Sequence, residues 1–146
     1  MLFKKKKALL YKENIQVNCK GESQEEVIRQ MGRMLVDTGY VGEGYIEAMI
    51  ERETSFSTYM GNGLALPHGV ESAKKEVKQS GIAVMVFPDG IMWGEETAKI
   101  VIGIAGVGEE HLTILGIIAE KMMEEETAEQ LLTGDVDTIY NILSGE

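Results

Sequence analysis

The histidine of the stretch GNGLALPHG, residues 61–69, is the residue of this sequence best suited to chemistry. Proline has a fixed backbone angle and favours an extended residue before it, and glycine permits close approach of another group. His68, between Pro67 and Gly69, is therefore expected at a rigid strand end with space beside it. A neutral imidazole there could act as a nucleophile, a general base or a ligand. The simpler alternative is a turn histidine bonded to a backbone carbonyl.

The segment before His68 carries groups that could bind an anion. For covalent work on phosphate, an imidazole needs donors for the phosphoryl oxygens. Hydroxyl and amide side chains offer such donors, as do glycines whose backbone amides point inward. The residues of this kind are Ser55, Ser57, Thr58, Gly61, Asn62 and Gly63. Composition alone favours the alternative that they simply form a loop.

Two further residues could stabilise a phosphoryl group. Arg52 is predicted at the end of a helix that points toward this loop, and a guanidinium group is a rigid, permanently charged partner for phosphate. His111 is predicted in the first turn of a later helix, where an anion is attracted. The alternative for each is a solvent-exposed surface residue, which is the commoner case for an arginine at a helix end. The sequence alone does not bring His111 near His68.

Hydrophobic periodicity predicts alternating strands and helices. Strands are predicted at residues 14–18, 64–66, 81–87 and 99–105. Helices are predicted from a capping box at Ser23 and Glu26 to Asp37, and at residues 43–52, 109–125 and 136–143. Residues 54–63 are predicted as a loop, residues 88–90 as a turn, and residues 92–94 as part of the connection between the last two strands.

The last two predicted strands are apolar on both faces, which is typical of central strands covered by helices. The chain is also the usual length of one domain, and we detect neither a repeat nor a linker. We therefore predict a single α/β domain over residues 1–146. It would be a three-layer sandwich, with a mixed sheet of four or five strands and helices on both faces.

Charge and composition exclude several classes of protein. A formal net charge of −10 disfavours a nucleic-acid binder, because phosphate backbones require a basic face. No stretch approaches the roughly 20 apolar residues of a membrane helix, and the basic run at residues 4–7 lacks the apolar region of a signal peptide. The single cysteine, Cys19, cannot form an internal disulfide. We therefore expect a soluble, cytoplasmic protein.

The number of cysteines and histidines, and the motifs that the sequence lacks, argue against metal, nucleotide and thiol chemistry. One cysteine and two histidines do not supply the ligands of a structural zinc site, so no metal is predicted. Walker loops, nucleophile elbows and paired cysteines are absent from the sequence. No cofactor is predicted either.

The segment ERETSFSTYMGNGLALPHG, residues 51–69, resembles the active-site signature of enzyme IIA domains of the sugar phosphotransferase system, in the mannitol and fructose class. The positions that match in register are Glu53, Met60, Gly61, Leu64, Ala65, Leu66, Pro67, His68 and Gly69. Similar features extend over most of the chain, including LVDTGYVGEGYIEAMIERE and the strand VIGIAG followed by EEHLTIL. The chain is more similar to the mannitol members of this class than to the fructose members.

The resemblance implies that His68 is a phosphorylated nucleophile. It would accept a phosphoryl group from the phosphohistidine of the small histidine-containing carrier protein and pass it to a cysteine of enzyme IIB, for uptake and phosphorylation of mannitol. The resemblance also implies that Arg52 and His111 flank the phosphate, without metal or cofactor. Membrane association would be indirect, through the sugar permease. The position of Asn62 is acidic in some relatives, which leaves its role open.

Four alternatives remain on the sequence alone. The protein could serve fructose or another polyol in the same way. It could be a regulatory domain of the same fold that is phosphorylated to control transcription, although such domains normally lie in longer chains. It could be a hydrolase with His68 as general base, although no orienting carboxylate is evident. It could also be a ligand-binding module with no covalent step.

Overall fold

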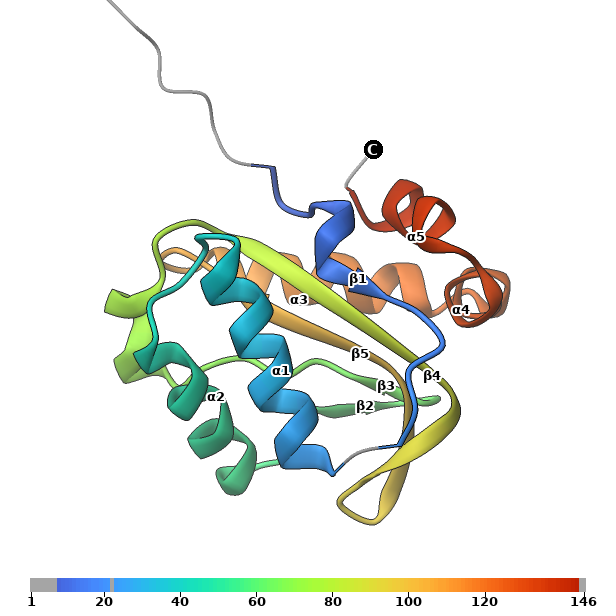
Figure 1. Ribbon diagram of the computed structural model, residues 1–146, viewed down its shortest axis with the longest axis horizontal. Helices are drawn as coiled ribbons and strands as arrows, with labels where there is room; N and C mark the ends of the chain where they lie inside the picture. The colour runs from blue at the N-terminus through green and yellow to red at the C-terminus, as the bar shows by residue number, and fades with distance from the viewer. Residues whose placement is uncertain (1–7, 22, 145–146) are drawn as a thin grey trace, which may run out of the picture.

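The computed structural model describes residues 8–21 and 23–144, which form a mixed sheet between two layers of helices (Figure 1). The strands are β1 (Ile15–Gln16), β2 (Tyr59–Gly61), β3 (Leu64–Ala65), β4 (Gly81–Trp93) and β5 (Glu96–Ala105). The helices are α1 (Gln24–Asp37), α2 (Gly44–Ser55), α3 (Glu110–Met122), α4 (Glu125–Thr133) and α5 (Val136–Leu143). Two short 3-10 helices are η1 (Lys12–Asn14) and η2 (Glu71–Glu76).

The sheet is built around the antiparallel pair β4 and β5, and its strand order is β1-β4-β5-β3-β2. Strand β1 runs parallel to β4, β3 runs parallel to β5, and β2 pairs with β3 as an antiparallel hairpin. The sheet is therefore mixed and five-stranded over the described residues, as the sequence predicts.

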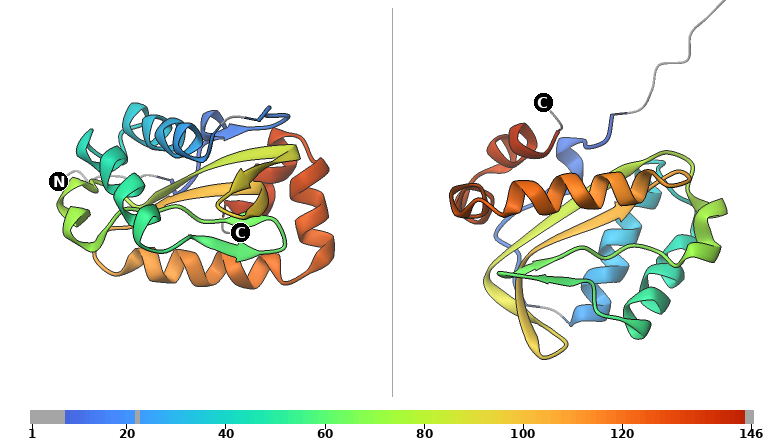
Figure 2. Two further views of the ribbon diagram at one scale, coloured as in Figure 1. Left: turned by 90° about the horizontal axis from the view of Figure 1, so that it is seen from below. Right: turned by 180° about the vertical axis from the view of Figure 1, so that it is seen from behind.

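The two faces of the sheet carry separate hydrophobic cores. In the left view of Figure 2, α1 and α2 cover one face of the sheet and α3 runs along the other. Side chains alternate along β5: Val101 packs with the α1 and α2 cluster, whereas Ile102 packs with the cluster of α3, α4 and α5. Because both faces are covered there, β5 is buried and without charged side chains from Ile100 to Ala105. The predicted three-layer α/β architecture is confirmed.

Strand β4 continues beyond the turn that the sequence predicts at residues 88–90. Pro88, Asp89 and Gly90 lie inside β4, where its pairing with β5 shifts register between Val86 and Ile91. Such an irregularity tolerates a proline, which cannot donate to the ladder, and Gly90 has a positive φ of 80° there. The hairpin instead turns just after Trp93, which is buried.

The predicted loop at residues 54–63 is also wrong in part. Its first residues complete α2, and its last residues form β2 and a tight hairpin turn. Gly61, Asn62 and Gly63 in that turn all have positive φ, at 102°, 53° and 82°. Left-handed backbone of this kind favours glycine and asparagine, so the composition of the segment reflects a hairpin as much as a loop.

The long helix predicted at residues 109–125 is two helices. Helix α3 ends at Met122, the backbone at Glu124 is extended, and α4 follows at once. The acidic run 124–126 therefore opens a new helix, where negative charge is favourable, rather than closing an old one. The helix predicted at residues 136–143 is confirmed as α5.

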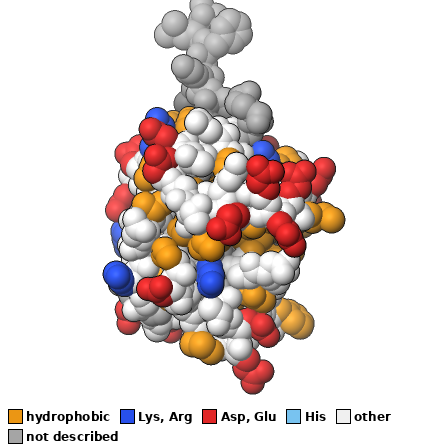
Figure 3. Space-filling model, turned by 90° about the vertical axis from the view of Figure 1, so that its right-hand side faces the viewer, with side chains coloured by type: hydrophobic (Ala, Val, Ile, Leu, Met, Phe, Trp, Pro, Cys, Tyr) orange, Lys and Arg blue, Asp and Glu red, His pale blue; other side chains and the backbone are white. Residues whose placement is uncertain are grey.

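Acidic side chains and apolar patches share the end of the molecule at the right of Figure 1, which faces the viewer in Figure 3. Within the described residues, no helix combines the length and the apolar character needed to cross a bilayer. The run at residues 4–7 lies outside the described residues.

Candidate active site

His68 lies where the chain leaves β3 and continues beside the end of β5. The Ile104 amide donates a hydrogen bond to the carbonyl of Pro67 at 2.9 Å, and His68 itself forms a parallel bridge with Ile104. On the other side, the amide of Leu66 donates to the carbonyl of Thr58 at 3.0 Å. The predicted rigid strand end is therefore present, and both flanking strands hold it.

The imidazole of His68 is oriented by its own backbone. Its Nδ1 lies 2.9 Å from the carbonyl oxygen of Leu66. A carbonyl only accepts hydrogen bonds, so in the neutral ring Nδ1 carries the proton and donates, and Nε2 keeps its lone pair. The geometry therefore makes Nε2 the nucleophilic or proton-accepting nitrogen.

The surroundings of His68 keep its ring neutral. Burial lowers the pKa of His68 below its ordinary value, and the positive charges of Arg52 and His111 lower it further. The hydrogen bond to Leu66 and the negative charge of Glu53 oppose this pKa shift. The net direction is downward, so the unprotonated Nε2 is available at neutral pH.

His111 faces His68 across a small gap. Their ring centroids lie 6.2 Å apart, with the rings tilted by 32°. His111 reaches this position from the first turn of α3, and Gly106 allows that turn to fold back against the end of β5. A Cβ atom at Gly106 would collide with the backbone of His111. The structure therefore brings together two histidines that the sequence could not place relative to each other.

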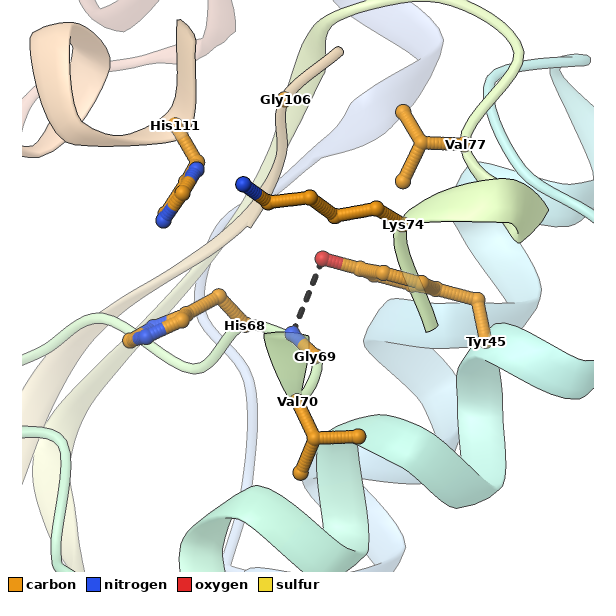
Figure 4. Close-up of a pocket in the computed structure, with 8 residues that line it drawn as sticks. All are labelled: Tyr45, His68, Gly69, Val70, Lys74, Val77, Gly106 and His111. Carbon is orange, nitrogen blue, oxygen red and sulfur yellow. Dashed lines mark hydrogen bonds between the residues drawn. The ribbon is translucent and has the colours of Figure 1, made fainter. Parts of the chain in front are cut away.

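Tyr45 of α2 supports the same strand end, and Figure 4 shows its hydroxyl directed at Gly69. Its hydroxyl accepts a hydrogen bond from the amide of Gly69 at 2.9 Å and donates one to the carbonyl of Ile104 at 2.8 Å. A Cβ atom at Gly69 would collide with the Tyr45 ring, so glycine is needed for this close approach. Burial raises the pKa of Tyr45 to about 12, and the hydroxyl remains a neutral bridge.

Arg52 lies in the last turn of α2, half-buried, and its Nη1 donates to the carbonyl of Phe56 at 2.7 Å. This contact holds the guanidinium group over the start of the loop that leads to β2. The positive charge of Arg52 lowers the pKa of His68. A permanent cation so placed can stabilise negative charge added to His68.

Glu53, which sequence reasoning placed only within the signature, organises the loop. Its carboxylate accepts from the amide of Thr58 at 2.8 Å, from the Thr58 hydroxyl at 2.6 Å and from Trp93 Nε1 at 2.9 Å. Thr58 is buried by these contacts and in turn supports Leu66, whose carbonyl orients His68. Thr58 therefore acts on the candidate nucleophile through the backbone.

The residues of the hairpin turn, Gly61, Asn62 and Gly63, are not brought to His68. Gly61 and Asn62 line a separate groove with Met122 and Met123, and the Gly63 amide donates to the Tyr59 hydroxyl at 2.8 Å. Leu64 pairs with Ile100 and His68 with Ile104, so the hairpin turn is roughly 13 Å along β5 from the imidazole. Ser57 is exposed, and its Oγ accepts from the amide of Tyr59 at 3.1 Å. This placement does not support a phosphate cradle made of the turn glycines and Asn62.

The pocket beside His68 contains a residue that sequence reasoning missed. Its lining residues are Tyr45, His68, Gly69, Val70, Lys74, Val77, Gly106 and His111. Lys74 comes from η2, a helix for which the sequence carries no periodic signal. The pocket holds about 20 Å³, room for about one water and far below the several hundred Å³ of small-molecule sites. The arrangement suits a small group attached to an imidazole at the surface.

Among the described residues, no cluster of three or more histidine, cysteine, aspartate or glutamate side chains is arranged to hold a metal ion. The chemistry available here is that of one neutral imidazole nucleophile, one guanidinium group, a second imidazole and an ammonium group. Phosphoryl transfer requires positioning and charge stabilisation, which these groups can supply.

The chain is similar to known proteins over most of its length. A family model described as phosphoenolpyruvate-dependent sugar phosphotransferase system, EIIA 2, matches residues 8–146. The mannitol-specific phosphotransferase enzyme IIA component of Bacillus subtilis (strain 168) is 49% identical over 138 residues, which cover 91% of this chain and 96% of that protein. The component of the same name from Halalkalibacterium halodurans is 49% identical over 125 residues, 86% of each chain.

Solved structures give the same result. The crystal structure of IIA mannitol from Escherichia coli superposes with a TM-score of 0.85 at 37% identity, covering 92% of this chain and 98% of that one. The enzyme IIA of an Escherichia coli complex with phosphorylated mannitol enzyme IIB superposes with a TM-score of 0.87 at 36% identity, covering 94% and 98%. This chain therefore belongs to the EIIA 2 family of the phosphoenolpyruvate-dependent sugar phosphotransferase system.

Proposed function

We propose that this protein is the phosphocarrier of a mannitol phosphotransferase system and that His68 Nε2 carries the phosphoryl group. The observation that supports this most directly is the hydrogen bond from Nδ1 to the Leu66 carbonyl, which leaves Nε2 unprotonated in a neutral ring. The relatives named mannitol-specific, at 49% identity over most of the chain, support the choice of mannitol.

The proposed reaction is two phosphoryl transfers in series. The lone pair of Nε2 attacks phosphorus while the nitrogen–phosphorus bond of the donor's phosphohistidine breaks and its electron pair returns to the donor imidazole. The thiolate of the enzyme IIB cysteine then attacks the same phosphorus, and the bond to Nε2 breaks. Throughout, the Leu66 carbonyl holds the Nδ1 proton, which stabilises the positive charge that the ring gains on phosphorylation.

Arg52 and His111 are proposed to stabilise the phosphoryl oxygens. Both lie close enough to His68 to lower its pKa electrostatically, and they approach from different elements, α2 and α3. Two donors on separate elements can contact different equatorial oxygens in the transition state. Such preorganised charge is the main source of catalysis in phosphoryl transfer.

The donor and the acceptor are proposed to dock in turn over His68. Apolar side chains are exposed close in sequence to Arg52 and His111, with Phe56 76% and Leu112 55% accessible. Met60, which is 55% accessible, lines the separate groove of Gly61 and Asn62. Tyr59, between Phe56 and Met60 in the chain, is half-buried. An apolar patch around a reactive group is typical of transient interfaces. We place the proposed transfer chain in the cytoplasm, with the membrane reached only through the sugar permease.

The test is phosphorylation with phosphoenolpyruvate, enzyme I and the histidine-containing carrier protein. We expect an acid-labile, base-stable phosphate on the wild-type protein and none on His68→Ala. An unlabelled wild-type protein, or a fully labelled His68→Ala variant, would refute the proposal. Transfer from the labelled protein to isolated mannitol and fructose enzyme IIB domains then identifies the sugar. Faster transfer to the fructose domain would overturn the assignment to mannitol.

A further inference from the structure

Lys74 has no role in the transfer proposed so far, although it lines the pocket together with His68 and His111. In Figure 4 its side chain extends from η2 past the hydroxyl end of Tyr45, and the ammonium group points toward His111. An ammonium group is a compact charge with three donors and is a common partner of phosphate. Its position at this pocket is therefore relevant to an anion on His68.

The present contacts of Lys74 favour such a role. Its side chain is only 28% exposed, so the stem is held by the fold while the charged end reaches the pocket. Nζ lies 3.6 Å from Oε1 of Glu109, whose side chain is 78% exposed. An ion pair with so exposed a carboxylate contributes little, so the pair with Glu109 does not hold the ammonium group away from a more highly charged anion.

We propose that Lys74 is a further catalytic residue whose ammonium group leaves Glu109 and contacts the phosphoryl oxygens on His68. This inference rests on the proposed function of His68. A phosphoryl group there brings nearly two negative charges to a protein whose formal net charge is already −10, so local cations are needed to stabilise it. No covalent bond to Lys74 forms or breaks: it keeps its protons while the phosphorus moves from the donor nitrogen to Nε2 of His68 and then to the acceptor sulfur.

The test compares Lys74→Met, which keeps the length of the stem and removes the charge, with Lys74→Arg, which keeps the charge. The matched control is Lys75→Gln, because Lys75 is the next residue of η2, is exposed and does not line the pocket. Each protein is phosphorylated by two donors: the phosphorylated carrier protein, and phosphoramidate, a small molecule that has no docking surface. The rate of phosphorylation of His68 is measured with each.

We expect Lys74→Met to slow phosphorylation by both donors about tenfold or more, as for loss of one charged donor to a transition state. Lys74→Arg should recover most of the rate, and Lys75→Gln should match the wild type. The phosphorus-31 resonance of phosphorylated His68 should also titrate at higher pH in Lys74→Met, because a cation that stabilises the dianion has been removed.

Three outcomes would overturn the role of Lys74. If the wild type is labelled and Lys74→Met is phosphorylated at the same rate, the role of Lys74 is refuted and the function of His68 stands. Slowing with the carrier protein but not with phosphoramidate would mean that Lys74 serves docking and not catalysis. A wild-type protein that neither donor labels would refute the proposed function itself, and the inference with it.

Discussion

The hydroxyl of Tyr45 lies 2.9 Å from the amide of Gly69, the residue that follows the candidate nucleophile. The same hydroxyl donates to Ile104, so one buried oxygen joins α2, the His68 segment and the end of β5. The bridge adds to the main-chain bonds that Pro67 and Leu66 form, and together these contacts hold the segment of His68.

Tyr45→Phe removes the bridge and keeps the ring. The amide of Gly69 and the carbonyl of Ile104 then lose a partner in a buried setting, at a cost of about 1–3 kcal/mol in the free energy of unfolding. Urea denaturation measures this cost. We also expect a changed nitrogen-15 spectrum of His68, because its segment is no longer held. Unchanged stability and an unchanged His68 spectrum would show that the bridge is dispensable.

Gly69→Ala is expected to destabilise the protein by about 1–3 kcal/mol, because the new methyl group overlaps the Tyr45 ring and overpacking costs that much in a dense core. Gly116→Ala is the control, since nothing lies within 4 Å of a Cβ atom at Gly116 in the middle of α3. It should stabilise the helix by up to about 1 kcal/mol. Equal effects of the two substitutions in thermal denaturation would contradict the predicted contact.

Glu53→Gln is expected to weaken the loop that supports His68. The carboxylate accepts three hydrogen bonds, whereas an amide has a single acceptor oxygen, so at least one donor of Thr58 or Trp93 loses its partner. Trp93 is the single tryptophan of the chain, so its fluorescence reports on this site directly. We expect a shifted emission maximum and a loss of about 1–3 kcal/mol in unfolding free energy. An emission spectrum identical to that of the wild type would argue against the carboxylate hub.

Arg52→Gln and His111→Ala are expected to slow transfer from His68 to enzyme IIB about tenfold or more with the fold intact. Quenched-flow measurement of phosphate loss from the labelled protein gives the rate. Arg29→Gln is a suitable control, because Arg29 pairs with Glu25 and Glu47 on the exposed surface of α1 and α2. If both variants transfer at the wild-type rate, these two residues have no part in stabilising the phosphoryl group.

The pH dependence follows from the lowered pKa of His68. Only the unprotonated ring attacks phosphorus, so phosphorylation by phosphoramidate should persist to a pH below the ordinary histidine value of 6.5 before it declines. Both Arg52→Gln and His111→Ala remove a positive charge, and each should raise the pKa of His68. A proton NMR titration of His68 measures all three values. A titration midpoint of His68 above pH 6.5 in the wild-type protein would contradict the lowered pKa.

The same shift affects stability in a defined direction. The unfolded chain binds the His68 proton more tightly than the folded chain, so acid favours unfolding. The contribution of His68 to the free energy of unfolding is therefore fully present above pH 6.5. It is lost as the pH falls from there through the lower pKa that His68 has in the folded protein. His68→Gln should show a smaller loss of stability over this range.

Local pattern is sufficient to predict much of the fold. The runs at residues 81–87 and 99–105 are apolar on both faces, which predicts strands covered on both sides, and they lie in the central strands β4 and β5. Ser23 caps α1 through its Oγ, 3.2 Å from the amide of Glu26, as the capping box predicts. The break between α3 and α4 carries no glycine or proline and is set by tertiary packing, in which Leu131 of α4 is buried. It could not be predicted from periodicity.

The residues of the candidate site that lie in one segment of the sequence can be predicted from it. The residues that come from distant elements cannot. The register of the signature leads to His68 and Arg52 directly. The proximity of His111 depends on the length of β5 and on Gly106, and the roles of Tyr45 and Lys74 depend on contacts between distant elements. Gly61 and Gly63 are predicted from the sequence to bind phosphate but form a hairpin turn. A hairpin turn with positive φ and a loop that binds an anion use the same residue types, so composition does not distinguish them.

The hydrogen bond between His68 and the Leu66 carbonyl also has a consequence for evolution. Which ring nitrogen reacts is chosen by a main-chain atom, and substitution of the side chain at position 66 does not remove that atom. The regiochemistry of phosphorylation can therefore survive sequence drift around the site for as long as the backbone keeps its path.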